Sequence, residues 1–123
     1  MTKVEQTKYN AWKASIKRKF DMTDTEWLKM LADQNGVCAI CGGVHKSGRR
    51  LHTDHNHKQA KELRKQGKSI KESVRGLLCT TCNMRLISRL GDRPDAVELF
   101  TNASNYLKQH KDLHKEETQQ TKD

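Results

Sequence analysis

Apolar residues near the amino terminus recur at the spacing of a helix. Trp12, Ile16 and Phe20 follow one another at intervals of four residues, and most positions between them are basic or polar. Residues that recur at this interval share one face of an α-helix. The pattern therefore predicts a basic, weakly amphipathic helix over residues 4–20.

A second helix is marked by the residues at its two ends. Thr23-Asp-Thr-Glu26 is a capping-box pattern, in which the terminal side chains satisfy backbone N–H groups reciprocally. Trp27 and Leu31 follow at helical spacing, and Asn35-Gly36 is a pair that tolerates positive φ. We expect a short helix that begins after Thr23 and ends at this pair.

The middle of the chain predicts two short strands separated by a long polar segment. Residues 51–55 are expected to be extended, and residues 74–78 (Val-Arg-Gly-Leu-Leu) to form the second strand. Residues 58–73 are mostly polar and basic, and Gly67 interrupts them. We expect a long loop there, with one helical turn around residues 60–65.

The carboxyl-terminal part predicts two more helices. The first should run from about Thr81 to Leu90 and be closed by Gly91, and Pro94 should lie in the first turn of the last helix. The apolar stripe of that last helix would consist of Ala96, Leu99, Phe100, Ala103, Tyr106 and Leu107. The elements together predict a mostly helical α+β protein.

Composition adds that the core is small and the surface basic. The 123 residues suffice for one domain, and 33% are hydrophobic, 32% charged and 5% aromatic. A domain with so little core material gains from a structural metal. The net charge of +9 favours phosphate-rich partners, although a solvated surface without a partner is the alternative.

The basic residues flank the middle of the chain. Residues 1–20 carry six Lys/Arg against one acid, residues 46–75 carry ten against three, and residues 92–123 carry five against seven. We expect three parts: a basic helix (1–20), a central domain (21–110) and a polar, disordered tail (111–123).

The chain shows no sign of secretion or of membrane insertion. Its first ten residues contain no apolar run, and no stretch approaches the roughly 18 apolar residues that span a bilayer. We therefore expect a protein of a reducing cytoplasm. Cysteine pairs in that compartment bind metal more often than they form disulfides.

Four cysteines form two CxxC pairs. Cys38 and Cys41 make the first pair, Cys79 and Cys82 make the second, and 37 residues lie between Cys41 and Cys79. Four thiolates in two such pairs favour a closed, tetrahedral structural Zn²⁺ site. The 37 residues exceed the usual zinc-ribbon spacing, so we expect the segment between the pairs to be a structured insert. Two disulfides or a redox CxxC are the alternatives, but the βαβ pattern that accompanies redox pairs is absent from the sequence.

Residues 51–57 (Leu-His-Thr-Asp-His-Asn-His) concentrate metal ligands and bases between the cysteine pairs. The oxygens of Asp54 and Asn83 suit a hard cation such as Mg²⁺, and His55 could take a proton from water. A polar loop with chance histidines or a second zinc site is the alternative. Asn83 by itself could equally be an ordinary residue at a helix start.

These motifs resemble the recombination endonuclease VII family of His-Me finger (HNH) nucleases. The resemblance covers roughly residues 20–108 and rests on several separated motifs in the right order. These are residues 36–42 (Gly-Val-Cys-Ala-Ile-Cys-Gly), 54–57 (Asp-His-Asn-His), 74–79 (Val-Arg-Gly-Leu-Leu-Cys) and 82–83 (Cys-Asn), with the helix starts before and after them.

The resemblance implies that residues 21–110 form a zinc-stabilised His-Me finger nuclease domain, a ββα-metal core with a structural Zn²⁺ on the four cysteines. If a phage encodes the protein, the expected cytoplasm is that of the bacterial host. It implies that Asp54 and Asn83 bind a catalytic Mg²⁺, for which Mn²⁺ can substitute, and that His55 is the general base. It also implies that His57 and His52 contact the scissile phosphate or orient the site. The expected products carry 5′-phosphate and 3′-hydroxyl ends.

Three features depart from the family pattern. Ile87 stands where the usual HNH pattern has a second metal-binding histidine, so Asn83 would serve alone. Leu86 stands where some members carry an acid, so that role is not transferred. The segment between His57 and Val74 is longer than usual, and its basic residues suggest an arm on DNA phosphates, with an inert insertion as the alternative. The expected substrate-binding residues are His52, Arg75, Lys61, Arg64, Lys65 and Arg85.

The sequence thus favours a metal-dependent DNA endonuclease that cuts duplex or branched DNA through phosphate contacts. A non-catalytic, zinc-stabilised DNA-binding module and an RNA-directed nuclease are the alternatives. A homodimer is left open, and no membrane partner is expected.

Overall fold

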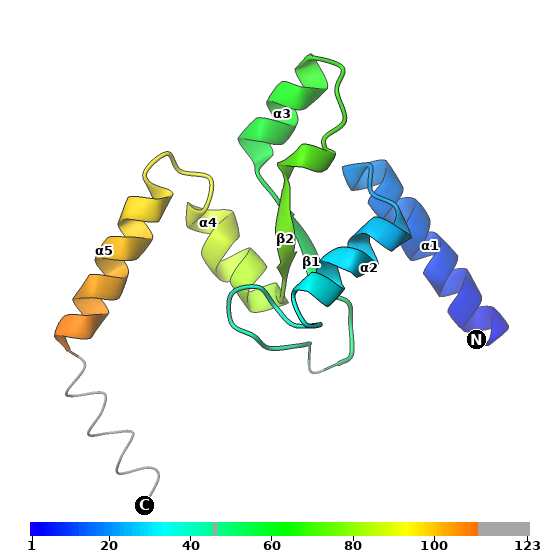
Figure 1. Ribbon diagram of the computed structural model, residues 1–123, viewed down its shortest axis with the longest axis horizontal. Helices are drawn as coiled ribbons and strands as arrows, with labels where there is room; N and C mark the ends of the chain where they lie inside the picture. Colours follow the sequence, from blue (N-terminus) through cyan, green and yellow to red (C-terminus); the bar gives the residue numbers. More distant parts are fainter. Residues whose placement is uncertain (46, 111–123) are drawn as a thin grey trace, which may run out of the picture. The chain divides into compact units, whose positions relative to one another are not determined.

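The computed structural model describes residues 1–45 and 47–110, so the polar tail predicted over residues 111–123 lies outside the described residues. The chain divides into two compact units, Met1–Asp92 and Arg93–Asp123. The first unit contains α1 (Lys3–Phe20), α2 (Asp24–Asp33), β1 (His52–His55), α3 (His57–Lys65), η1 (Lys71–Ser73), β2 (Val74–Leu78), η2 (Cys82–Ile87) and α4 (Ser88–Leu90), and the second contains α5 (Ala96–Gln109) (Figure 1).

Helices α1 and α2 confirm the two predicted amino-terminal helices. The capping box of α2 is complete: Glu26 N–H donates to Thr23 Oγ1 (3.1 Å), and Thr23 N–H donates to Glu26 Oε1 (2.9 Å). The helix ends where expected, with φ values of +59° at Asn35 and +76° at Gly36. In residues 1–45 and 47–110, no helix is both long and apolar enough to cross a membrane.

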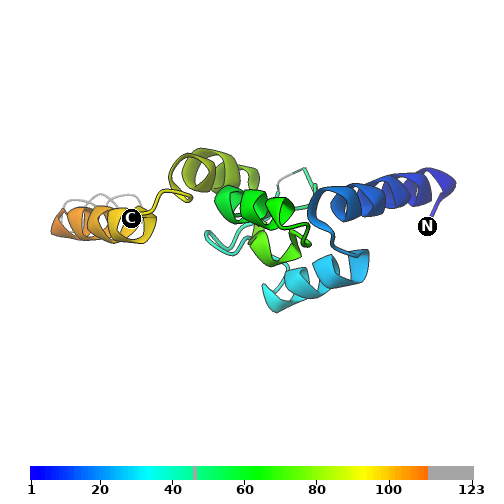
Figure 2. The same ribbon diagram turned by 90° about the horizontal axis from the view of Figure 1, so that it is seen from above.

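Trp27 anchors these helices on the strands. It is 1% exposed, its ring meets that of Trp12 edge-on at 5.0 Å, and its Nε1–H donates to Thr53 Oγ1 at 2.9 Å. Helices α1 and α2 lie on one side of the two strands, and η2 with α4 lies on the other (Figures 1 and 2). The hydrophobic core of the first unit therefore forms around the strands, with Ile16, Leu77 and Trp27 among its buried members.

The two predicted strands pair into one antiparallel sheet. His52 faces Leu78 and Asp54 faces Gly76, but His55 faces Val74 because the register shifts between Asp54 and His55. Arg75 is thus the extra residue of a β-bulge. Bulges next to functional sites often redirect a side chain.

The side chain of Gln34, at the end of α2, forms hydrogen bonds with the outer edge of β2. Gln34 lies at the C-cap of α2, where its Oε1 accepts from Leu77 N–H and its Nε2 donates to the Leu77 carbonyl, both at 2.9 Å. The amide therefore takes the place that a third strand would have. Leu77 is fully buried, so these backbone groups have little access to water.

We expect Gln34→Ala to destabilise the fold. The variant leaves the buried Leu77 N–H without this acceptor, which should cost about 1–3 kcal/mol in the free energy of unfolding. Urea denaturation measures the loss, and Gln66→Ala, at the exposed end of α3, is the matched control. Equal midpoints for the two variants would contradict the role of the Gln34 amide.

Residues 57–65 form a regular helix, so the prediction of a loop with one turn was wrong there. The Asn56 side chain caps α3 by accepting from Gln59 N–H, and Ala60 is fully buried on the inner side. Gly67 (φ +68°) ends the helix in a Schellman motif, with Lys68 N–H donating to the Leu63 carbonyl. The prediction missed α3 because a helix with so few apolar residues gives little periodic signal.

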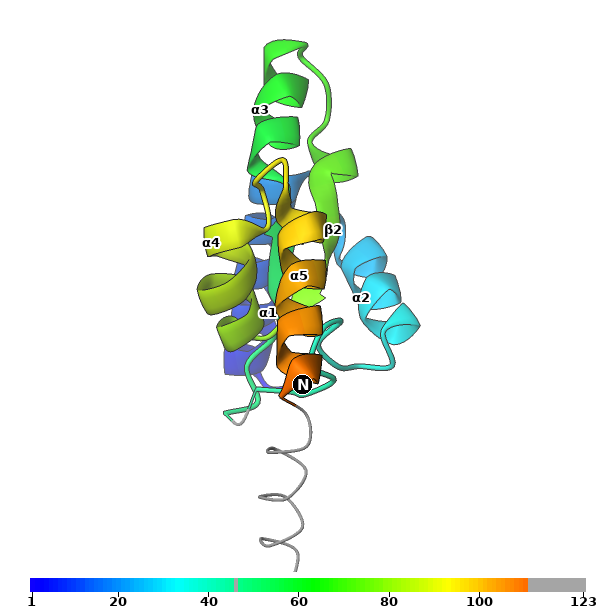
Figure 3. The ribbon, with the colours of Figure 1, turned by 90° about the vertical axis from the view of Figure 1, so that its left-hand side faces the viewer.

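The segment that follows α3 is tied to the amino-terminal helices. Ser69 Oγ donates to Asp21 Oδ2 at 2.5 Å, Lys71 Nζ lies 2.8 Å from Glu26 Oε2, and Ile70 is buried. Helix α3 therefore extends beyond the end of the strands from a fixed base (Figures 1 and 3).

The predicted helix over residues 81–90 is present as η2 and α4, which run on as one helix (Figure 1). Its first part, Cys82–Ile87, has the wide π-type winding that is frequent at functional sites. Gly91 ends the helix as expected, and a Cβ there would lie 2.8 Å from the Ile87 carbonyl oxygen. The strands β1 and β2 and the helix after them are the predicted elements, with α3 and η1 inserted between the two strands.

In the second unit, α5 begins later than predicted. Ala96 N–H donates to the Arg93 carbonyl, so Pro94 lies in a turn before the helix and not in its first turn. The ring of Pro94 fixes φ at a position of this turn that favours proline. Of the predicted apolar stripe, Ala96 is buried, whereas Tyr106 and Leu107 are largely exposed.

Candidate active site and metal centre

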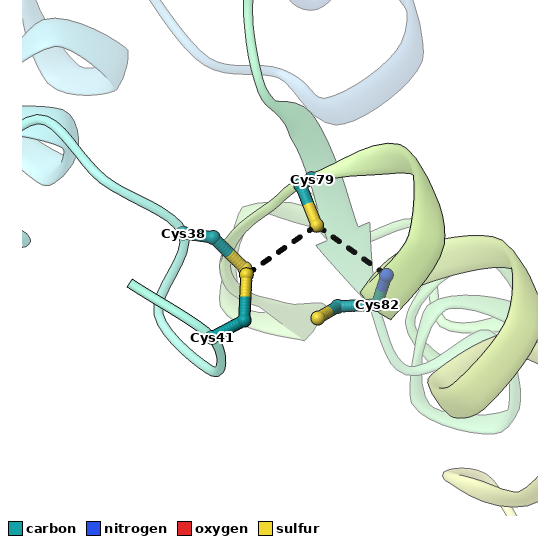
Figure 4. Close-up of side chains that lie close together, drawn as sticks. All are labelled: Cys38, Cys41, Cys79 and Cys82. Carbon is teal, nitrogen blue, oxygen red and sulfur yellow. Dashed lines mark hydrogen bonds between the residues drawn. The ribbon is translucent and has the colours of Figure 1, made fainter. Parts of the chain in front are cut away.

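The four cysteines converge on one point in the first unit (Figure 4). Cys38 and Cys41 lie in the loop after α2, Cys79 follows β2, and Cys82 begins η2. Their sulfurs all lie within 4.8 Å of one another, and Cys41 Sγ is 3.7 Å from Cys79 Sγ. Zn–S bonds of about 2.3 Å in a tetrahedron imply S–S separations of about 3.8 Å. The cluster could therefore hold a structural zinc ion.

The thiols of the cluster differ in pKa because their surroundings differ. Burial raises the pKa of Cys38, but backbone N–H donors, those of Cys41 and Cys79 first among them, outweigh it and lower the pKa to about 6. Burial and the neighbouring thiols raise the pKa of Cys82 to about 12. A bound cation favours the thiolate form of every ligand, so it would lower the pKa of Cys82 as well.

A pocket of ≈ 420 Å³ lies beside the cluster, between the strands and η2. Six of the ten predicted catalytic and substrate-binding residues line it, together with Thr53, Met84 and Ser88; the six are His52, Asp54, His55, His57, Arg75 and Asn83. Lys61, Arg64, Lys65 and Arg85 are exposed and do not line it. The fold thus gathers the histidines and oxygen donors in one place and leaves four of the basic residues outside it.

His55 is packed between two rings. Its imidazole lies 4.3 Å from that of His57 and 5.4 Å from the ring of Phe20, measured between centroids. Burial lowers the pKa of His55, and the nearby His57 lowers it further, so the imidazole is neutral near pH 7. Phe20 is an apolar residue at the end of α1, and no local pattern indicated that it would adjoin this histidine.

Asp54 is a buried carboxylate held by Arg75. The residue is 8% exposed, Arg75 Nε donates to its Oδ2 at 2.8 Å, and Arg75 Nη2 donates to its Oδ1 at 3.0 Å. Each carboxylate oxygen has a second lone pair. Asp54 can therefore accept these hydrogen bonds and still offer an oxygen to a cation from the pocket.

Asn83 is held by His52. Asn83 Nδ2 lies 3.3 Å from His52 Nδ1, and His52 Nε2 lies 3.2 Å from Thr80 Oγ1. Burial lowers the pKa of His52, so the ring is neutral and can accept at Nδ1 while donating at Nε2. This arrangement uses the amide nitrogen of Asn83 and leaves Oδ1 for another partner.

His57 contacts an acid that the sequence did not single out. His57 Nδ1 lies 2.7 Å from Asp92 Oδ2, and the His57 side chain is 64% exposed. Burial raises the pKa of Asp92, but the His57 hydrogen bond and the charge of Arg75 outweigh it and hold the pKa below its usual value. Asp92 belongs to a segment that sequence reasoning used only as a helix start, so its contact with His57 was missed.

The fold and the site define a small α+β protein in which a four-cysteine cluster adjoins a pocket of histidines and oxygen donors. The chain belongs to the recombination endonuclease VII family, because the model of that family matches residues 13–109. The resemblance found in the motifs is thereby confirmed.

The curated relatives are phage proteins. The chain is 33% identical over 97 residues to the Gene 59 protein of Mycobacterium phage L5. The matched region covers 79% of this chain and 50% of the relative. The chain is 32% identical over 98 residues to the Gene 59 protein of Mycobacterium phage D29, with 80% and 50% covered. The chain thus spans about half the length of the curated relatives it matches. No solved structure matches it significantly.

Proposed function

We propose that this chain is a zinc-stabilised, metal-dependent DNA endonuclease that hydrolyses phosphodiester bonds in duplex or branched DNA. One observation carries the proposal: His55, Asp54 and Asn83, from β1 and η2, line the same pocket. Membership of the recombination endonuclease VII family supports it. A chance cluster of polar residues would not be expected to bring a base and two oxygen donors together.

The donor set fits a hard cation. Mg²⁺ prefers carboxylate and amide oxygens and keeps several waters, and Asp54 and Asn83 offer one oxygen of each kind to the pocket. When bound, the cation would neutralise charge on the scissile phosphate and its leaving oxygen. The four sulfurs would hold zinc as a separate, structural ion, since a site filled by thiolates has no open position for substrate.

The chain's own residues would carry out the proton transfer and the positioning. The neutral imidazole of His55 would accept a proton from the attacking water as its oxygen bonds to phosphorus. The bond to the 3′ oxygen breaks, and that oxygen takes a proton from solvent, which leaves 5′-phosphate and 3′-hydroxyl ends. His57, whose Nδ1 faces Asp92, would contact a phosphate oxygen through Nε2, either by donating in its doubly protonated form or through a water molecule.

The DNA would reach this pocket along α3. Lys58, Lys61 and Lys65 recur at helical spacing on the face away from the buried Ala60, and all three are exposed. The helix begins at His57, so its basic face adjoins the pocket. Arg64 and Arg85 are proposed as flanking phosphate contacts, and the basic residues of α1 as a further contact surface.

We expect the triple variant Lys58→Gln/Lys61→Gln/Lys65→Gln to bind DNA more weakly and with less dependence on salt. Each lost phosphate contact should reduce the slope of log K against log [salt] by about 0.9 for duplex DNA. Fluorescence anisotropy at several salt concentrations measures it. Lys29→Gln, which removes an exposed lysine from α2, is the control, and an unchanged slope in the triple variant would leave α3 as an inert insertion.

The proposed function is tested by measuring cleavage at increasing Mg²⁺ concentrations. Supercoiled plasmid, a four-way junction and a single-stranded RNA are compared as substrates. Metal-dependent cleavage of either DNA, suppressed by EDTA, is the expected result. DNA binding without cleavage at any Mg²⁺ or Mn²⁺ concentration would instead favour a non-catalytic binding module. Cleavage of the RNA alone would overturn the assignment of DNA as substrate.

A further inference from the structure

Arg75 joins two acids that approach it from different parts of the chain. As the extra residue of the β-bulge, it donates to both oxygens of Asp54 and, through Nη2, to the His55 carbonyl at 3.2 Å. Its Nη1 lies 3.0 Å from Asp92 Oδ1. The guanidinium, 33% exposed, is therefore shared between β1 and the segment that follows α4.

Asp92 in turn joins Arg75 to a histidine of the pocket. Its Oδ2 lies 2.7 Å from His57 Nδ1, and its Oδ1 faces Arg75. Within residues 1–45 and 47–110, the buried Oδ1 has no hydrogen bond of good geometry, so the Arg75 contact is the charge interaction that compensates its burial. The four side chains form an unbroken series: Asp54, Arg75, Asp92 and His57.

We propose that Asp92 is a positioning residue of the nuclease site, acting on His57 through Nδ1 and on Asp54 through Arg75. The inference rests on the proposed function, and it assigns to Asp92 a role that neither the motifs nor the family description gives it. Asp92 itself does not line the pocket, so it acts through the residues that do.

The physical effect on His57 is to select one ring nitrogen. An acceptor at Nδ1 fixes the hydrogen there and aims Nε2 away from Asp92, which orients an otherwise exposed ring. Without it, the His57 side chain loses the contact that limits its rotamers. If a group that contacts the substrate is not held in one orientation, the rate of the chemical step falls more than the affinity for the substrate does.

The physical effect on Asp54 is to balance charge around Arg75. Two carboxylates share one guanidinium, so the positive charge of Arg75 is divided between Asp54 and Asp92. Without Asp92, the whole charge of Arg75 falls on Asp54, which should weaken the attraction of that carboxylate for a cation. Partners that orient a metal ligand typically change metal affinity or activity by about 10–100-fold.

The test compares Asp92→Ala and Asp92→Asn with wild type, and Asp33→Asn, on the exposed end of α2, is the charge-matched control. Three quantities are measured: kcat and KM for plasmid cleavage, Mn²⁺ affinity by electron paramagnetic resonance, and the ¹⁵N shifts of the His57 ring. Zinc content and thermal melting check that each variant is folded.

Asp92→Ala is expected to lower kcat by about 10–100-fold with a smaller change in KM, to weaken Mn²⁺ binding and to shift the His57 ring signals. Asp92→Asn keeps an oxygen that can accept from His57 Nδ1–H, so it should restore the His57 signals and part of kcat but not the Mn²⁺ affinity. Asp33→Asn should match wild type in all three.

An Asp92→Ala variant with wild-type kcat, Mn²⁺ affinity and His57 signals would overturn the proposal. The proposal and the nuclease function can fail separately. If wild type cleaves no nucleic acid, the function fails, while the Mn²⁺ and NMR measurements still decide whether Asp92 positions His57 and Asp54.

Discussion

Replacing His55 by alanine is expected to reduce the rate of DNA cleavage by about 10²–10⁴-fold, the usual contribution of a positioned general base. His55 lies in the pocket between the rings of Phe20 and His57, and its lowered pKa keeps it neutral and ready to accept a proton. The variant should keep its zinc content and its affinity for DNA, because His55 belongs to neither the cysteine cluster nor the basic face of α3.

The measurement is single-turnover cleavage of a labelled duplex and a four-way junction at saturating Mg²⁺. His110→Ala, at the C-cap of α5, removes a histidine from the other unit and should cleave like wild type. Equal rates for wild type and His55→Ala would remove His55 as the base. A variant that loses zinc as well would indicate a structural role instead.

Replacing Cys79 by serine is expected to abolish zinc binding and unfold the first unit. Cys79 follows β2 directly, and its Sγ faces Cys41 Sγ and accepts from Cys82 N–H, so it links the loop after α2 to the start of η2. Structural zinc contributes about 10–16 kcal/mol in small zinc domains, which is comparable with the whole stability of a domain of about 5–15 kcal/mol. The small apolar core could not offset that loss.

Zinc content is measured by atomic absorption and folding by circular dichroism and thermal melting. Thr81→Ser, inside the same CxxC pair, is the matched control and should bind one zinc and melt like wild type. A folded, zinc-free Cys79→Ser protein would contradict the scaffold role of the cluster. Wild type purified without metal but fully folded would contradict it equally.

The elements whose signals are local could be predicted from the sequence. The capping box of Thr23 and Glu26 sets the start of α2 through contacts within one turn, and Asn35-Gly36 ends it by backbone preference alone. The cysteine cluster was equally accessible, since two CxxC pairs bring their own ligand geometry. The position of Asn83 next to Cys82 follows from covalent connection.

The predictions that were wrong concern elements whose stability comes from packing or from turns. Helix α3 has a cap and a buried Ala60, but too few apolar residues for its periodicity to show. Pro94 is compatible with a helix start or with the turn before it, and the Arg93–Ala96 hydrogen bond decides between them.

The sequence by itself determined the two amino-terminal helices, the two strands, the helix after them, the two CxxC pairs and the identity of the candidate base and oxygen donors, because each is marked by residues close together in the chain. Only the tertiary structure decided how those side chains are held. The ring of Phe20 against His55 and the contact of Asp92 with His57 each join residues 35 positions apart, and the bulge at Arg75 depends on the pairing of two strands. Such contacts depend on distances through space, which a linear pattern does not encode.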